Sequence, residues 1–138
     1  MNTTDCLFCK IIRSEIPSER VYEDADSFAF LDIHPNNPGH TLVIPKKHSE
    51  NLYDMDDHGL AAIMRTAQKV ALAIKEAVGA DGINLNMNNE PAAGQLILHP
   101  HIHVIPRFKE DGYKHWGRQA YKEGEAKEVA EKIRSSLK

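Results

Sequence analysis

Three histidines, His99, His101 and His103, stand at alternate positions in one short run of the chain. Successive side chains of a β-strand point to opposite faces, so this spacing predicts a strand that carries all three imidazoles on one face. A neutral imidazole is substantially unprotonated near pH 7 and is a good nucleophile toward phosphorus. The spacing itself predicts only the shared face, and the alternative is a histidine-rich strand that faces water without a catalytic role.

A second group with chemical potential is the pair Cys6 and Cys9, which forms a C-x-x-C motif. Such a pair can be a redox dithiol, half of a metal site, or two small buried residues. A redox pair is expected to open a helix that follows a strand, and the sequence predicts no strand before Cys6. A thiol redox function is therefore the weakest of the three interpretations.

The elements that must position these residues follow from hydrophobic periodicity. Short runs of strand-forming residues, separated by turn formers, predict a sheet that includes the histidine run. The other predicted strands cover residues 20–24, 27–33, 40–44 and 82–88.

The clearest predicted helix covers residues 56–78. Asp56 or Asp57 can cap its start, and Gly79 suits its end. Its apolar residues recur every three or four positions, which predicts one face packed against the sheet. These apolar residues are Leu60, Ile63, Met64, Ala67, Val70, Ala71, Ile74 and Val78. The predicted fold class is α+β, with a mainly antiparallel five-stranded sheet and one long helix across it.

Composition and charge exclude several classes of protein. The chain has 138 residues, which fits one compact domain that buries a core without disulfides. A formal net charge of −3 gives no broad basic field for nucleic acid, and no apolar run approaches the length of a membrane span. Because the sequence has two cysteines and no recognisable secretory signal, we expect a cytoplasmic protein.

The composition changes after the histidine run, where the chain becomes charged and aromatic. We expect residues 1–107 to form one domain, and residues 108–138 to form a C-terminal segment that belongs to the same domain or to a dimer. An amphipathic helix is predicted near the end of this segment. Its apolar residues are Ala126, Val129, Ala130, Ile133 and Leu137. The sequence leaves open whether this helix packs on its own chain or on a partner.

The histidine run resembles the signature of the histidine triad family, in which histidines alternate with hydrophobic residues. Residues 30–33 and 38–46 are similar to the family's nucleotide-pocket half, and Asn88 with Gly94 and Gln95 is similar to its phosphate loop. The resemblance covers the chain from the N-terminal cysteines to about residue 107. It implies a homodimer in which the sheets of two chains join.

The resemblance also implies a role for each site residue. His101 would form a covalent bond to the α-phosphorus of a nucleotide, His103 would donate to a phosphate oxygen, and His40 would complete the triad's hydrogen bonds. The implied nucleotide-binding set, for a purine nucleotide, comprises Asp32, Ile33, Asn88, Gly94, Gln95, His101 and His103.

A structural Zn²⁺ site is implied as well. Zinc-binding relatives use a C-x-x-C, a histidine after the pocket strand, and the first histidine of the triad. Here those positions are Cys6, Cys9, His48 and His99. Zinc in a structural role favours four nitrogen and sulfur ligands in a tetrahedron, which leaves no open coordination position. The alternative is a metal-free pair of reduced cysteines.

The expected function is a nucleotide hydrolase or transferase that acts on purine phosphoramidates and adenylated amines. One alternative is a diadenosine polyphosphate hydrolase or phosphorylase. Another is a zinc-stabilised nucleotide-binding adaptor with little turnover. Two positions depart from the family's pattern: Leu96 replaces a serine or threonine that can bond the leaving group, and Pro100 removes a backbone N–H from the strand.

Overall fold

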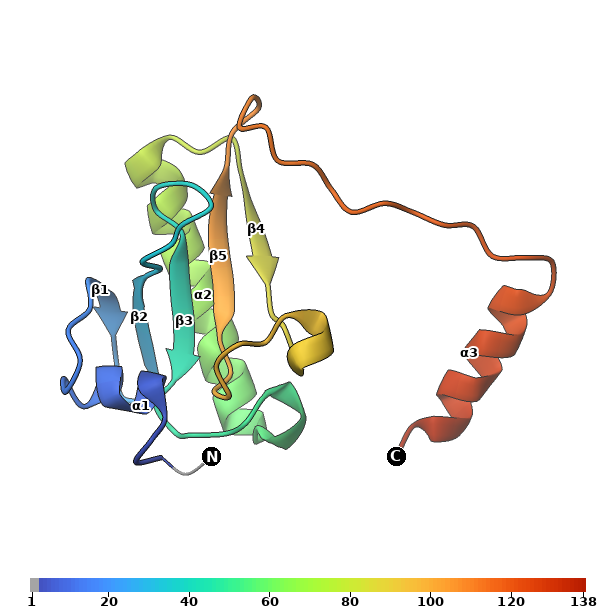
Figure 1. Ribbon diagram of the computed structural model, residues 1–138, viewed down its shortest axis with the longest axis horizontal. Helices are drawn as coiled ribbons and strands as arrows, with labels where there is room; N and C mark the ends of the chain where they lie inside the picture. Colours follow the sequence, from blue (N-terminus) through green and yellow to red (C-terminus); the bar gives the residue numbers. More distant parts are fainter. Residues whose placement is uncertain (1–2) are drawn as a thin grey trace.

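The computed structural model describes residues 3–138, which form one five-stranded sheet with three α-helices (Figure 1). The strands lie in the order β1-β2-β3-β5-β4, and every neighbouring pair is antiparallel. They are β1 (Arg20–Glu23), β2 (Ser27–Leu31), β3 (Thr41–Pro45), β4 (Gly82–Asn86) and β5 (Ile102–Arg107). The helices are α1 (Leu7–Ile12), α2 (Asp57–Val78) and α3 (Glu125–Ser136), with 3-10 turns η1 (Leu52–Asp54) and η2 (Pro91–Ala93). This arrangement confirms the predicted fold class.

Helix α2 begins and ends where its sequence predicts. The Asp56 carboxylate accepts the backbone N–H of Gly59 at 2.7 Å, and Gly79 adopts the left-handed conformation that ends the helix. The buried face of α2 packs across one face of the sheet (Figure 1). Its buried residues are Ala62, Ile63, Thr66, Ala67, Val70 and Ile74.

The prediction that Met64 belongs to the core is wrong. Met64 is 54% exposed and lies with Leu72 on the flank of α2, beside the edge strand β4. Leu85 of β4 is also 46% exposed beside these residues. Together with Ile83 of β4, these side chains line an open groove of about 690 Å³ between α2 and the edge of the sheet.

The second face of the sheet holds a separate core under α1. Phe28 and Phe30 of β2 pack there with Leu42 and Ile44 of β3, and Phe8 of α1 covers them. Because side chains alternate along a strand, His40, two positions before Leu42, lies on this same face of the sheet. The site residues therefore lie on the face opposite α2.

The histidine run is not one continuous strand, which corrects the prediction. Strand β5 begins only at Ile102, so His99 lies in a bend and His101 just precedes the ladder. Pro100 has no N–H to donate, which explains why pairing cannot extend back through it. The predicted alternation nevertheless holds, because Ile102 and Val104 are buried against α2.

The C-terminal segment leaves the sheet after β5 and carries α3 away from the rest of the chain (Figure 1). No residue of α3 is buried, and Ile133 is 59% exposed. Trp116 and Tyr121, on the extended stretch before α3, are 87% and 65% exposed. Within residues 3–138, none of the helices has the length and apolar character needed to cross a membrane.

Candidate active site and metal centre

His40 and His103 form a directed hydrogen-bonded pair. The backbone N–H of Asn36 donates to His40 Nδ1 at 3.1 Å, so in the neutral ring the proton of His40 sits on Nε2. His40 Nε2 lies 2.9 Å from His103 Nδ1 and therefore donates to it. His103 Nδ1 is thus an acceptor, which leaves its own proton on Nε2.

His101 has the opposite tautomer. Its Nδ1 lies 2.7 Å from the backbone carbonyl oxygen of His99, and a carbonyl only accepts, so His101 Nδ1 carries the proton. The lone pair of His101 is therefore on Nε2. The rings of His101 and His103 are 5.1 Å apart between centroids. The site thus places an Nε2 lone pair next to an Nε2–H donor.

Burial keeps these imidazoles neutral. Removal from water lowers the pKa of His40, His101 and His103, and the pKa of His103 falls to about 4 because neighbouring imidazoles add to the effect of burial. The Asp32 carboxylate, 3.6 Å from His40 Nε2, acts in the opposite direction but does not reverse the shift. An uncharged ring is the nucleophilic form of histidine.

Asp32 and Ile33 follow directly after β2. The other oxygen of Asp32 accepts the backbone N–H of His34 at 2.8 Å, which orients the carboxylate beside His40. Ile33 is 84% exposed, so its side chain is available to a flat apolar ligand. The two residues lie at the same end of the sheet as the His40–His103 pair.

The loop after β4 contains Asn88, Gly94 and Gln95. Strand β4 ends at Asn86, two residues earlier than predicted, so Asn88 stands in the loop, where its side-chain nitrogen lies 3.5 Å from the carbonyl of Gly94. Gly94 has a φ of 94°, a left-handed backbone conformation that a residue with a side chain adopts only with strain.

The Gln95 side chain is only 3% exposed and is fully occupied within the protein. Its nitrogen donates to the carbonyls of Glu50 at 2.7 Å and Ile97 at 3.0 Å, and its oxygen accepts the N–H of Glu90 at 2.8 Å. Gln95 therefore ties together three segments of chain, and its side chain has no spare donor for a phosphate.

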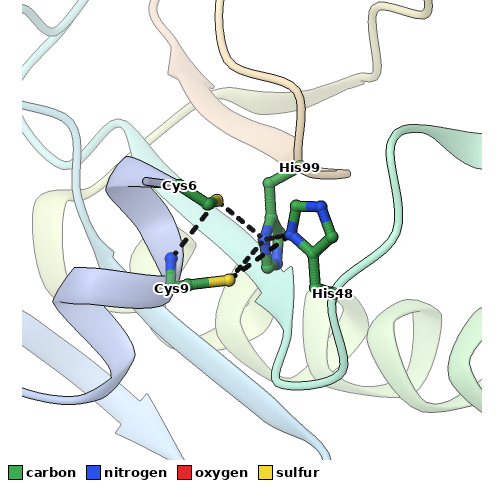
Figure 2. A group of neighbouring side chains, drawn as sticks. All are labelled: Cys6, Cys9, His48 and His99. Carbon is green, nitrogen blue, oxygen red and sulfur yellow. Dashed lines mark hydrogen bonds between the residues drawn. The ribbon is translucent and has the colours of Figure 1, made fainter. Parts of the chain in front are cut away.

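Figure 2 shows that Cys6, Cys9, His48 and His99 converge from three parts of the chain. Cys6 caps α1 and Cys9 lies within it, His48 follows β3, and His99 precedes β5. All four ligand atoms lie within 4.8 Å of one another. His99 and Cys6 are fully buried.

The distances between these atoms fit a tetrahedral zinc ion. Zinc with Zn–N near 2.05 Å and Zn–S near 2.3 Å needs ligand separations of roughly 3.3–3.6 Å for N–N and N–S pairs. The two Nδ1 atoms are 3.2 Å apart, Cys6 Sγ is 3.4 Å from His99 Nδ1, and Cys9 Sγ is 3.4 Å from His48 Nδ1. His99 Nε2 donates to the carbonyl of Pro45 at 2.8 Å, which turns the Nδ1 lone pair toward the thiols.

The same cluster is unlike a redox dithiol. Burial, together with the neighbouring Cys6 sulfur, raises the pKa of the Cys9 thiol to about 11. Reactive cysteines have lowered pKa values and partial exposure, whereas both thiols here are buried. The donor set thus suits a bound metal ion better than thiol exchange.

Two residues with a place in the site were missed by sequence reasoning. Phe8, between the two cysteines, packs edge-on against His99 and His101, with centroids 5.9 and 5.1 Å away. Its position between two predicted metal ligands could have indicated that Phe8 lies near the histidines. Asn36 acts on His40 through its backbone N–H, and no side-chain pattern reports such a contact.

Comparison with known proteins gives consistent matches. Residues 13–110 match the HIT domain family. The chain is 45% identical over 107 residues to adenylylsulfatase HINT3 of Arabidopsis thaliana, which covers 78% of this chain and 54% of that protein. It is 37% identical over 135 residues to adenosine 5'-monophosphoramidase hnt1 of Schizosaccharomyces pombe, which covers 96% of this chain and 98% of that protein.

Solved structures share the fold. A member of the HIT family from Bacillus subtilis is 39% identical, with a TM-score of 0.90 over 97% of this chain and 98% of that one. A zinc-bound histidine triad family protein from Mycobacterium smegmatis is 34% identical, with a TM-score of 0.78 over 99% of this chain and 100% of that one.

Proposed function

The chain belongs to the HIT domain family, and we propose that it is a nucleotide hydrolase or transferase that forms a nucleotidyl-histidine on His101. The observation that carries this proposal is the pair of opposite tautomers, an Nε2 lone pair on His101 beside an Nε2–H on His103. Relatives named adenylylsulfatase and adenosine 5'-monophosphoramidase support hydrolysis of nucleotide derivatives at a general level.

The reaction proceeds in two displacements at the α-phosphorus. His101 Nε2 attacks, the P–N bond forms, and the bond from phosphorus to the leaving group breaks. His103 Nε2–H donates to a non-bridging oxygen and stabilises the charge that develops there. Water or another acceptor then attacks, the P–N bond breaks, and the electron pair returns to His101 Nε2. The leaving group takes up a proton from solvent as it departs, and the attacking water later releases one to solvent, so protons balance over the two steps.

The nucleotide lies across the end of the sheet. Asp32 accepts from the ribose hydroxyls, and Ile33 packs against the base. Asn88 donates to the phosphate, and Gly94, which has no side chain, lets the phosphate approach the loop closely. Gln95 belongs to the same loop, and because its side chain is internally bonded, its part is to hold the loop's shape.

The substrate class is adenosine or guanosine carrying a leaving group on the α-phosphate. The names of the relatives favour phosphoramidates and adenylyl sulfate. Leu96 is 89% exposed and offers no hydroxyl, so a leaving amine receives no hydrogen bond from this side chain. A diadenosine polyphosphate would use the same nucleophile with a nucleotide leaving group.

Zinc is the metal we assign to Cys6, Cys9, His48 and His99. The tetrahedral separations and the zinc-bound relative support it. When bound, the ion supplies a structural cross-link between α1, the turn after β3 and the approach to β5. The four protein ligands complete its coordination.

The same proposal includes a homodimer. Strand β4 is an edge of the sheet, and the groove beside it exposes Met64, Leu72 and Leu85. Joining two such edges extends the sheet across both chains and covers these apolar side chains. Residues 1–107 then form the nucleotide domain, and residues 108–138 extend toward the second chain.

His101→Ala tests the function. We expect the kcat for adenosine 5'-phosphoramidate or adenylyl sulfate to fall on the order of a thousandfold or more, because the nucleophile is lost. His115→Ala, which changes an exposed histidine of the C-terminal segment, is the matched control and should retain wild-type turnover. If only the hydrolysis of diadenosine tetraphosphate depends on His101, the protein is a diadenosine polyphosphate hydrolase or phosphorylase instead. If wild type turns over none of the three compounds but still binds AMP, the protein is a nucleotide-binding adaptor and not an enzyme of this type.

A further inference from the structure

The Asp111 carboxylate gathers hydrogen-bond donors where the C-terminal segment leaves the sheet. Arg107 donates through Nε at 2.7 Å and Nη2 at 3.1 Å, and Asn37 Nδ2 donates at 3.1 Å. The backbone N–H groups of Phe108 and Tyr113 donate at 3.1 and 3.0 Å. The Asp111 side chain is only 5% exposed, and these donors hold its pKa far below the usual range of a carboxyl. We call Asp111, Arg107, Asn37 and Tyr113 the Asp111 clasp.

The clasp joins three parts of the fold. Arg107 also donates to Asn84 Oδ1 of β4 at 2.7 Å and to the carbonyl of Tyr113 at 2.9 Å. Asn37 Nδ2 also donates to the carbonyl of Pro106 at 2.8 Å. The start of the C-terminal segment is therefore fixed to two strands and to the loop between β2 and β3.

The clasp continues into the active site through one residue. The Tyr113 hydroxyl donates to the backbone carbonyl of Asn36 at 2.8 Å. The N–H of the same Asn36 donates to His40 Nδ1, and His40 donates to His103. An unbroken path of contacts thus runs from Tyr113 through Asn36 and His40 to the ring of His103.

The loop that carries Asn36 needs this outside support. Residues 32–40 contain no helix or strand, and most of them are exposed. A loop of this kind is held mainly by the hydrogen bonds made to it. The Arg107–Asp111 pair is local, four residues apart at the end of β5, whereas the Tyr113 hydroxyl reaches 77 residues back along the sequence to the loop.

We propose that Tyr113, held in place by the Asp111 clasp, is a positioning residue that fixes Asn36 and thereby the tautomers of His40 and His103. The C-terminal segment is then connected to the chemistry of its own chain. The effect on turnover rests on the function proposed above, whereas the effect on the tautomers does not.

Tyr113→Phe removes one hydroxyl and tests the path. Tyr121→Phe makes the same chemical change on an exposed tyrosine of the same segment and is the matched control. Ring ¹⁵N NMR at neutral pH reports which nitrogen of each histidine carries the proton. We expect Tyr113→Phe to shift the His40 and His103 signals toward mixed tautomers and to lower kcat about three- to tenfold, with KM within about twofold. Tyr121→Phe should match wild type in both measurements.

A second variant separates the clasp from the hydroxyl. Asp111→Asn weakens the anchor of Tyr113 and should shift the same histidine signals, with a larger fall in kcat than Tyr113→Phe. Identical histidine spectra in Tyr113→Phe, Tyr121→Phe and wild type would overturn the proposal. If wild type turns over none of the nucleotide substrates, the proposed function fails, while the spectra still decide the role of Tyr113.

Discussion

At the scale of residues, main-chain atoms decide what the histidines can do. One carbonyl, that of His99, makes His101 Nε2 a lone pair, and one N–H, that of Asn36, makes His103 Nε2 a donor by way of His40. The sequence predicted that the imidazoles share a face. It could not predict their tautomers, because every residue type offers the same carbonyl and nearly every type the same N–H.

The lowered pKa of His103 predicts a pH dependence of stability. Its folded pKa is about 4 because of burial, whereas an unfolded histidine titrates near 6.5. Between these values the unfolded chain binds a proton that the folded chain does not, so the free energy of unfolding should fall as the pH is lowered through this window. Urea unfolding at several pH values between 7 and 4.5 measures the slope.

Variants assign that slope to the buried ring. His103→Gln should show a shallower decrease than wild type, because one of the depressed histidines is gone. His115→Gln should parallel wild type. Equal slopes in all three proteins would show that His103 does not contribute.

The metal site predicts a separation of stability from chemistry. His48→Gln removes a ligand without touching His101, so we expect bound zinc per chain to fall and Tm to drop by roughly 10 °C, as for loss of a tightly bound ligand. His34→Gln, on an exposed loop, should keep both at wild-type values. Elemental analysis with thermal unfolding measures them. Equal zinc contents in the two variants would contradict the assignment.

At the scale of elements, regular structure was predictable and the loops were not. The bounds of α2 followed from an N-terminal aspartate, a periodic apolar face and a C-terminal glycine. The strand through the histidines was predicted too long, since Pro100 stops the ladder before Ile102. The hydrogen bonds of the Gln95 side chain could not be predicted either. Its partners are main-chain groups of Glu50, which is 45 residues away, and of Glu90, and main-chain groups carry no sequence signal.

The loop after β4 stores strain that Gln95 offsets. Glu90 has φ of 72° and ψ of 154°, a region that glycine occupies freely and other residues rarely. Gln95→Ala removes the acceptor of the Glu90 N–H, and we expect Tm to fall by roughly 5–10 °C. Adding Glu90→Gly to that variant should recover part of the loss, since the strain disappears.

Glu90→Ala in the same background is the comparison. It deletes the carboxylate but keeps the strained backbone, so it should recover nothing. Equal recovery by alanine and glycine would assign the effect to the carboxylate instead. Thermal unfolding of the single and double variants gives the answer.

At the scale of the whole molecule, apolar surface stays uncovered beside the edge strand β4 and along the C-terminal segment. The groove between α2 and β4 is open, and the aromatic residues before α3 lie in solvent. The sequence predicted the amphipathic C-terminal helix but not its separation from the sheet, because periodicity reports that a face is apolar and not what covers it.

The two edges of the sheet provide a matched test of the homodimer. Leu85 on β4 and Val21 on β1 are 46% and 44% exposed. Leu85→Glu should weaken association at least tenfold, because it buries a charge in the joined edge. Val21→Glu should leave association unchanged. Sedimentation equilibrium compares the two variants with wild type, and a monomeric wild type or an equal effect at both edges would exclude the β4 interface.

His99 belongs to both centres, but through different atoms. Its ring faces the thiols, while its main-chain oxygen orients the ring of His101, the proposed nucleophile. Any residue at this position supplies that oxygen. Substitution of the side chain can therefore remove the candidate metal ligand without removing the hydrogen bond to His101, so the two proposed properties can be gained or lost separately in evolution. A lineage of this fold could lose the four-residue metal set and still keep the geometry around His101.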